Sequence, residues 1–320
     1  MKSEVTPGMF SKVEHTVSRK NPIVMAAFAA VVFVFFGVLG NSADVTWQFT
    51  KADALWALPN FVVSSSLVGI VVGVLLAAIT AVSFVLVSRR VQPPLWLSLI
   101  FGLLAVIALL SWLAAGNTIQ FAFIMSNAIV LAVPIALGAM GGIMSERVGV
   151  VNIAIEGQLL TGAFLAAVVG SLTDNLWLGL LAAMIGAALM SMVLAAFSIK
   201  YLVDQVIVGV VLNVLVIGIT NFLYSQWLAQ DGQNSNFPGT FDIVPIPVLS
   251  EIPVLGPALF ANRVTTYLAF LIIPALWFFL FKTKLGLRAR AVGEHPLAAD
   301  TVGINVARTR FWWVTLGGAV

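Results

Sequence analysis

Long apolar runs separated by shorter polar segments make up most of this chain. Each run is close to the length of about 20 residues that a helix needs to cross about 30 Å of hydrocarbon. The runs predicted to be complete membrane-spanning helices are 22–39, 61–87, 95–115, 119–143, 150–172, 176–199, 205–227 and 264–281. The pattern therefore predicts an all-α fold, a polytopic transmembrane helical bundle with eight complete spans.

A ninth apolar run begins at Phe311 and reaches the last residue, Val320. At about 1.5 Å per residue, this run covers roughly half of a bilayer. We therefore expect a truncated ninth span and a chain that is C-terminally incomplete.

Composition supports the same class of protein. Hydrophobic residues make up 61% of the 320 residues and charged residues 9%, whereas soluble domains carry roughly 25% charged residues. The apolar runs are unbroken rather than alternating over segments of about ten residues, which favours helices over a barrel. The chain has no cysteine and two histidines, both in polar segments, so we expect neither disulfides nor a metal cluster. The net charge of +3 gives no indication of nucleic-acid binding.

The placement of lysine and arginine predicts the orientation of the spans, because these residues favour the cytoplasmic side. The segment 282–310 carries six of them, and we place it in the cytoplasm. Counting the spans backwards then puts the 228–263 loop, with Arg263 as its one basic residue, on the extracytoplasmic side. The other basic clusters fall inside under this topology: Lys200, Arg147, Arg89 with Arg90, and the N-terminal segment 1–21, whereas the single Lys51 of the 41–60 loop falls outside. The predicted organisation is a cytoplasmic segment 1–21 followed by a transmembrane domain 22–320.

Polar residues recur along single faces of the predicted spans. Seven residues turn a helix by about 700°, so residues seven apart lie about 20° from each other on one stripe. The stripe in the 119–143 run holds Gln120, Asn127, Pro134 and Gly141, and that in the 205–227 run holds Gly209, Asn213 and Thr220. Because polar groups are costly in hydrocarbon, we expect these stripes to face away from lipid. The candidates for a substrate pathway are Asn127, Asn152, Glu156 and Asn213.

Glu156 is the acidic residue predicted to lie deepest in a span. If its helix is continuous, Ser145, Asn152 and Glu156 fall within about 40° of one another. A carboxylate in a span costs roughly 2.5 to 3.5 kcal/mol on insertion scales, so it is rarely idle. Two roles stay open: Glu156 accepts hydrogen bonds from a substrate, or it fixes helix packing by pairing with Asn152, Arg147 or another buried donor. The asparagines leave the same choice, because amides often bridge helices.

Glycines mark places where these spans are expected to break or to approach each other closely. We expect helix interruptions near Gly141 with Gly142 and near Gly149. At the remaining glycines of this region, close packing is the simpler interpretation.

The segment 282–310 is a long charge-dense stretch between two apolar runs. Within it, residues 294–304 read as a short helix, because Pro296 suits a first turn and Gly303 suits a helix end. By composition alone the segment is either a plain cytoplasmic connector or a surface that meets a partner.

Two separated motifs resemble the permease subunits of ATP-driven importers. Residues 286–304, GLRARAVGEHPLAADTVGI, are similar to the cytoplasmic coupling loop of the branched-chain amino acid/ribose/nucleoside permease family. Residues 145–162, SERVGVVNIAIEGQLLTG, resemble the same family, and its nucleoside branch looks nearest. The resemblance covers most of 124–320. The glutamate of the general importer signature is absent, since Leu297 precedes Ala298 and Ala299.

The resemblance implies a permease subunit of an ATP-binding cassette importer, moving nucleosides by alternating access across the cytoplasmic membrane of a prokaryote. It implies a cytoplasmic ATPase, a second homologous permease and an extracytoplasmic substrate-binding protein or lipoprotein as partners. ATP and Mg belong to the ATPase and no cofactor to this chain, in keeping with the lack of a GxxxxGK[ST] motif. The residues expected to couple to the ATPase are Gly293, Glu294, Pro296, Ala298, Ala299, Asp300 and Gly303.

An ion-coupled secondary transporter of a small polar solute is the alternative. Such a transporter needs a carboxylate or a sodium site near the middle of the membrane, and Glu156 is its acidic candidate. A membrane enzyme is disfavoured, because the sequence offers no paired catalytic residues at one depth.

Overall fold

The computed structural model describes residues 19–50, 56–230 and 236–320, so most of the predicted segment 1–21 lies outside the described residues. The chain divides into two compact units, Met1–Ala122 and Phe123–Val320. Among the described residues, eight helices are long and apolar enough to cross a membrane. The predicted multi-span helical fold is therefore confirmed.

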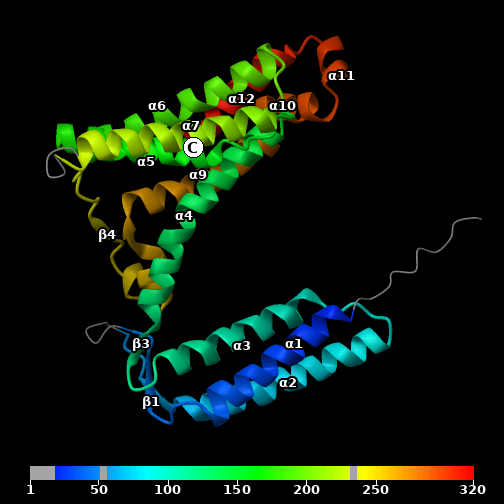
Figure 1. Cartoon of the computed structure of the whole chain (residues 1–320), viewed down its shortest axis with the longest axis vertical. Coiled ribbons are helices and arrows are strands. Elements are labelled where there is room, and N and C mark those ends of the chain that lie inside the picture. The colour runs from blue at the N-terminus through cyan, green and yellow to red at the C-terminus, as the bar shows by residue number, and fades with distance from the viewer. Residues whose placement is uncertain (1–18, 51–55, 231–235) are drawn as a thin grey trace, which may run out of the picture. The chain divides into compact units, whose positions relative to one another are not determined.

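Three long helices form most of the first unit (Figure 1). They are α1 (Lys20–Val31), continued as a π-helix over Val32–Val38, α2 (Ser65–Ser88) and α3 (Leu95–Leu113). Their apolar side chains share a core that includes Leu76 and Phe101. The π-helix and α2 come so close at Gly37 and Gly69 that a Cβ at either position would overlap the facing chain. Small residues of this kind let membrane helices pack backbone to backbone.

A small sheet in this unit was not predicted. Its strand order is β2-β1-β3, in which β1 (Asp44–Gln48) pairs antiparallel with β2 (Phe61–Ser64) and parallel with β3 (Thr118–Gln120). Alternate residues of β1 point inward and form a buried cluster with Ile119. The sheet takes up the first residues of two predicted spans, 61–87 and 119–143. Gln120 therefore lies in a strand and not on the predicted helical stripe.

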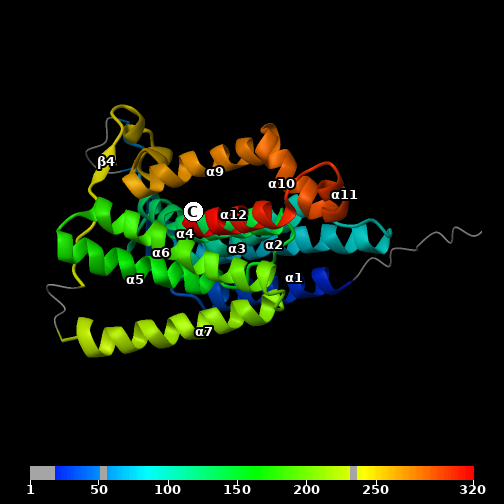
Figure 2. The same ribbon diagram turned by 90° about the horizontal axis from the view of Figure 1, so that it is seen from above.

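The second unit consists of long helices joined at their ends. They are α4 (Phe121–Glu146), whose first two residues belong to the first unit, α5 (Ile155–Thr173), α6 (Leu176–Ala195), α7 (Gln205–Leu223), α9 (Val264–Lys282), α10 (Lys284–Glu294), α11 (Pro296–Thr301) and α12 (Val306–Ala319). Two of them continue as π-helices, α6 over Ala196–Lys200 and α7 over Tyr224–Leu228. Figure 2 shows α10 and α11 at the opposite end of this unit from β4.

The core of the second unit gathers near the end that carries α10. It includes Val148, Val150, Leu194, Ala289 and Val314, which are all fully buried. Helix α12, where the ninth apolar run was predicted, begins five residues earlier than expected, at Val306. It packs against α4 and α6 through Gly317 and Gly318, because a Cβ on Gly317 would lie 2.7 Å from the Gly141 carbonyl oxygen.

The 228–263 loop contains regular structure at the other end of this unit. Strand β4 (Ile243–Pro245) pairs antiparallel with β5 (Ala261–Arg263), and between them lie a 3-10 helix, Leu249–Glu251, and a π-helix, Gly256–Phe260. The Phe237 N–H donates to Ser171 Oγ at 2.9 Å, which ties the loop to the end of α5. The loop and the α10–α11 region thus lie at opposite ends of the unit, as the predicted alternation of the spans requires.

The same loop holds a short repeat that sequence analysis overlooked. The tetrapeptide Ile-Pro-Val-Leu occurs at 246–249 and again at 252–255. In each copy the leucine N–H donates to the proline carbonyl two residues back, at 2.8 and 2.7 Å, and the valine has a positive φ of 67° or 64°. These are tight γ-turns of the rarer, strained kind.

Candidate functional site

The connection between α4 and α5 is a non-helical segment, 147–154, that turns back into the unit. Gly149 adopts a φ of +77°, and the Val150 N–H donates to the Ser145 carbonyl at 3.1 Å. The expected interruption near Gly149 is therefore confirmed. The one expected near Gly141 with Gly142 is wrong, because α4 continues to Glu146 and Gly141 serves the contact with α12.

Asn213 of α7 closes the first turn of α5. Its side-chain oxygen accepts from the Gly157 N–H at 2.8 Å, and its amide nitrogen donates to the Ile153 carbonyl at 2.9 Å. The first N–H groups of a helix have no partner within the helix, so Asn213 acts as an N-cap supplied by another helix. About two turns before Asn213 on α7, Gln205 Oε1 accepts from the Val151 N–H at 2.6 Å. Gly209, on the same face of α7, leaves room for Ile153.

Asn152 and Gln158 form a buried amide pair across the same turn. Asn152 Nδ2 donates to Gln158 Oε1 at 3.0 Å, and Gln158 Nε2 donates to Asn152 Oδ1 at 3.3 Å. Asn152 Oδ1 also accepts from the Ala154 N–H at 3.1 Å. Both side chains are only 5% exposed, so this pair satisfies polar groups that would otherwise be costly to bury.

Glu156 lies in the first turn of α5 with its side chain exposed. The predicted face of Ser145, Asn152 and Glu156 is wrong, because no continuous helix joins these residues. None of the predicted pairings of Glu156 occurs with a described residue. Asn152 pairs with Gln158, Arg147 lies over the Phe281 ring, and no other described donor bonds to Glu156. The positive end of a helix dipole favours a carboxylate at this position.

The structure brings Asn152, Glu156 and Asn213 together and leaves Asn127 apart. Asn127 is exposed on the first half of α4. Ile155 contacts α4 at Gly138 and Gly142, and Gly138 lies roughly 16 Å along the helix from Asn127. The predicted pathway residues are therefore one cluster of three and a separate asparagine.

A partly open cavity of about 210 Å³ lies beside the amide pair, between α4, α5, α6 and α12. Of the described side chains that line it, Gln158 is the polar one, and the others are small or apolar. Ligand pockets are typically about 300 to 1,000 Å³. This cavity is smaller than such a pocket, so it does not by itself define a substrate site.

The two motifs singled out in the sequence touch each other at the α10 end. Gly293 of α10 lies against the 147–149 turn so closely that a Cβ would overlap the Arg147 carbonyl oxygen. Arg310 of α12 donates from Nε to the Val148 carbonyl at 3.0 Å. The predicted coupling segment is thus joined directly to the segment that leads into α5.

Helix α11 forms where the short helix was predicted. Pro296 is its first residue, and Gly303, with a φ of +81°, follows its end. His295 Nδ1 accepts from the Ala298 N–H at 3.1 Å and caps the start. Ala299 is buried, whereas the predicted coupling residues Glu294, Ala298 and Asp300 are exposed. Two apolar side chains stand out into solvent, Leu297 at 75% and Val302 at 74% exposure.

Three residues of this region were not predicted to act in the site. Gln158 belonged to the 145–162 motif, and its polarity within an apolar run was the available signal. His295 directly precedes Pro296, the usual place for a capping side chain. Arg310 gave no local signal, because its contact with Val148 joins distant parts of the chain. Among the described residues, no group of three or more His, Cys, Asp or Glu is placed to hold a metal ion.

Comparison with known proteins gives several ABC transporter permeases as relatives. The guanosine ABC transporter permease protein NupQ of Bacillus subtilis is 42% identical over 199 residues, 59% of this chain and 61% of the relative. The putative glucose ABC transporter permease protein TsgC13 of Haloferax volcanii is 40% identical, over 62% of this chain and 60% of the relative. The nucleoside ABC transporter permease protein NupC of Lactococcus lactis is 36% identical, over 64% and 65%. The chain thus spans somewhat less than two thirds of the length of these relatives, and no solved structure matches it.

One family model covers most of the second unit. It is described as the permease component of the branched-chain amino acid transport system, and it matches residues 124–320. This range contains the 147–154 segment, the amide pair, the Asn213 cap and helices α10 and α11. The chain belongs to this permease family, as the two sequence motifs predicted.

Proposed function

We propose that the chain is the membrane-spanning permease subunit of an ATP-binding cassette importer for nucleosides in the cytoplasmic membrane of a prokaryote. Its partners are a cytoplasmic ATPase that binds ATP and Mg, a second homologous permease and an extracytoplasmic substrate-binding protein or lipoprotein. The membership of the family and the names of NupQ and NupC support this proposal.

The main observation behind the proposal is that the α10–α11 region contacts the 147–149 turn on one side and exposes apolar side chains on the other. On its inner side, Gly293 contacts the 147–149 turn, which leads through Asn152 to the start of α5. On its outer side, Leu297 and Val302 are exposed within a charge-rich segment. Isolated large apolar side chains are normal on a surface, but here two flank one short helix at the basic end of the unit. A docked ATPase that moves α11 would move the 147–154 segment as well.

Within this proposal, the four pathway candidates divide into two roles. Asn152 and Asn213 hold the start of α5, since their amides are bonded to Gln158 and to backbone groups. Glu156 and Asn127 are exposed, and their side chains can accept hydrogen bonds from sugar hydroxyls or base N–H groups. We assign substrate contact to Glu156 and Asn127. An E156Q variant is then expected to lower nucleoside uptake while thermal stability stays unchanged.

A sugar is the second candidate substrate, because the glucose permease TsgC13 is 40% identical to this chain. Uptake of labelled guanosine, glucose and leucine by cells producing the complete transporter separates the candidates. Guanosine uptake that unlabelled nucleosides compete away supports the proposal, and uptake of glucose alone contradicts the assigned substrate. The ion-coupled alternative is tested in the same cells, since it predicts uptake that survives ATP depletion and stops with a proton ionophore.

The docking assignment is tested with an L297E/V302E double variant. Both side chains point away from the chain, so the protein should insert and melt as the wild type does. Copurification of the ATPase and substrate uptake should both fall at least about tenfold, because a charge in the centre of an apolar contact is left without a partner. L202E is the matched control: Leu202 is 83% exposed and lies outside the coupling segment. Undiminished ATPase binding by L297E/V302E would contradict the assignment.

A further inference from the structure

Three cations gather on two aromatic rings at the end of α9. The guanidinium carbons of Arg147 and Arg290 lie 5.6 and 5.2 Å from the centre of the Phe281 ring. Lys282 Nζ lies 5.8 Å from the Trp277 ring, and the two rings are 6.3 Å apart. We call these five residues the basic–aromatic cluster.

The cluster has no counter-charge in the part of the chain that the structure describes. None of its three cations forms an ion pair or a hydrogen bond with a described residue, and Arg290 Nε is buried without an acceptor. Glu146 and Glu294, the nearest carboxylates along the chain, are exposed and form no ion pair with these cations. Contacts with a ring face stabilise a cation only modestly at exposed sites. Three gathered positive charges therefore form a local field that attracts an anion.

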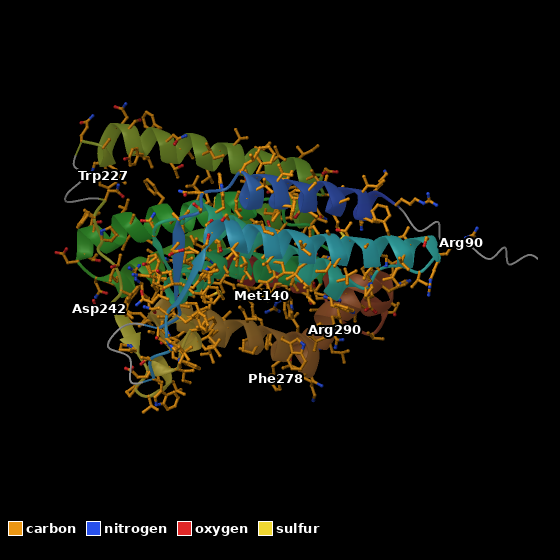
Figure 3. All side chains as sticks on the ribbon, turned by 90° about the horizontal axis from the view of Figure 1, so that it is seen from below. Arg90, Met140, Trp227, Asp242, Phe278 and Arg290 are labelled. Carbon is orange, nitrogen blue, oxygen red and sulfur yellow. The ribbon has the colours of Figure 1, made fainter. Side chains whose placement is uncertain are left out.

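The position of the cluster indicates which anion it meets. Lys282 is the last residue of α9, a helix long and apolar enough to span a membrane. In the last two turns of the same helix, before Lys282, aromatic side chains are exposed: Trp277 is 55%, Phe278 57% and Phe281 37% exposed. Figure 3 shows Phe278 and Arg290 at this edge of the unit. An exposed aromatic face that ends in cations fits the boundary between lipid tails and headgroups.

We propose that the basic–aromatic cluster binds the phosphate of an anionic phospholipid. Arg147 and Arg290 supply forked guanidinium donors, whose geometry suits phosphate oxygens, and Lys282 adds a third charge. The acyl chains lie along the exposed face of Trp277 and Phe278. A free phosphate would use the cations but not the apolar face beneath them. The proposal is independent of the transported substrate.

The test measures lipid binding by the purified full chain in detergent. Native mass spectrometry counts phosphatidylglycerol and phosphatidylcholine molecules retained from an equimolar mixture. The wild type should retain phosphatidylglycerol preferentially. R147Q and R290Q should each lower that preference about fivefold, and the double variant about twentyfold. The reason is that each basic side chain near a membrane surface raises the affinity for anionic lipid about fivefold.

R288Q is the matched control, because Arg288 is an exposed arginine of α10 outside the cluster. It removes the same charge and should leave the preference unchanged. Size-exclusion chromatography shows whether each variant is folded. If the double variant is not folded, the two single variants still test the site. Equal losses in R147Q, R290Q and R288Q, or no loss in any of them, would overturn the site. Inorganic phosphate that displaces phosphatidylglycerol at equal concentration would overturn its assignment to a lipid.

Discussion

The start of α5 and helix α11 both follow a break in a helix, yet their surroundings differ in kind. At the start of α5, side chains from another helix and a buried amide pair satisfy the backbone groups. At α11, the cap is the adjacent His295, one alanine is buried, and two large apolar side chains face solvent. The first region is fixed by contacts within its own unit, and the second has an exposed outer face.

The two sequence motifs therefore differ in their surroundings although they touch. In the 145–162 motif, the amide side chains of Asn152 and Gln158 are hydrogen-bonded to each other and hold the turn before α5. The 286–304 motif is buried on one side through Ala289, Val292 and Ala299 and free on the other. Substitutions of the amide residues that hold the start of α5 should therefore affect stability, and under the proposed function substitutions on α11 should affect ATPase binding.

The largest effect is expected from N213A. The variant leaves the Gly157 N–H and the Ile153 carbonyl without their partner, and the loss of two such bonds should destabilise the protein by about 3 kcal/mol. The measurement is thermal unfolding of the purified protein in detergent. N221A is the control, since Asn221 is exposed on the same helix and should change stability little. Equal melting temperatures for the two variants would mean that the cap is unimportant.

A somewhat smaller effect is expected from G293A. The new Cβ would overlap the Arg147 carbonyl, a backbone atom that cannot move away cheaply, and overpacking of this kind costs roughly 1 to 3 kcal/mol. The same substitution at Gly218 of α7 meets open space, so G218A should be neutral or slightly stabilising. Thermal unfolding again reports the result. If G218A lowered the melting temperature as G293A does, the close contact between the two motifs would be contradicted.

The amide pair should show a measurable coupling. In a double-mutant cycle of N152A and Q158A, the double variant should lose about 1 kcal/mol less than the sum of the single variants, because either substitution already breaks the pair. Additive losses would show that the two side chains act separately.

The smallest effect is expected at α11. H295A removes the cap at the Ala298 N–H and should raise the rate of amide hydrogen exchange in α11. The increase should correspond to a loss of about 0.5 to 1 kcal/mol of local stability, while the melting temperature of the protein stays the same. H295N restores a capping acceptor and should restore protection. A global loss of stability in H295A would show that α11 is not as independent as its contacts indicate.

The sequence was sufficient for those parts of the fold that depend on local pattern. Unbroken apolar runs predicted the spans, and Pro296 and Gly303 predicted the limits of α11. The predicted break at Gly149 also rested on a local property, the freedom of glycine to adopt positive φ.

Features that depend on distant contacts were missed or misread. The β1–β3 sheet joins strands that pair only after the chain has folded, so the apolar residues 61–63 read as the start of a helix. Gly141 looked like a helix breaker, because its contact with Gly317 of α12 cannot be seen from either segment alone. The role of Asn213 was open for the same reason: an amide in a span can bind a substrate or cap a neighbouring helix, and position in three dimensions decides.

The cap on α5 also bears on how the protein is made. The side chains that complete its first turn are attached 54 to 60 residues later in the chain. While the ribosome is still making α6, the peptide groups of 151–157 have neither Gln205 nor Asn213 to bond, and bare peptide groups are costly in hydrocarbon. The backbone bonds at this end of α5 can therefore be completed only after α7 has been made and has packed against it.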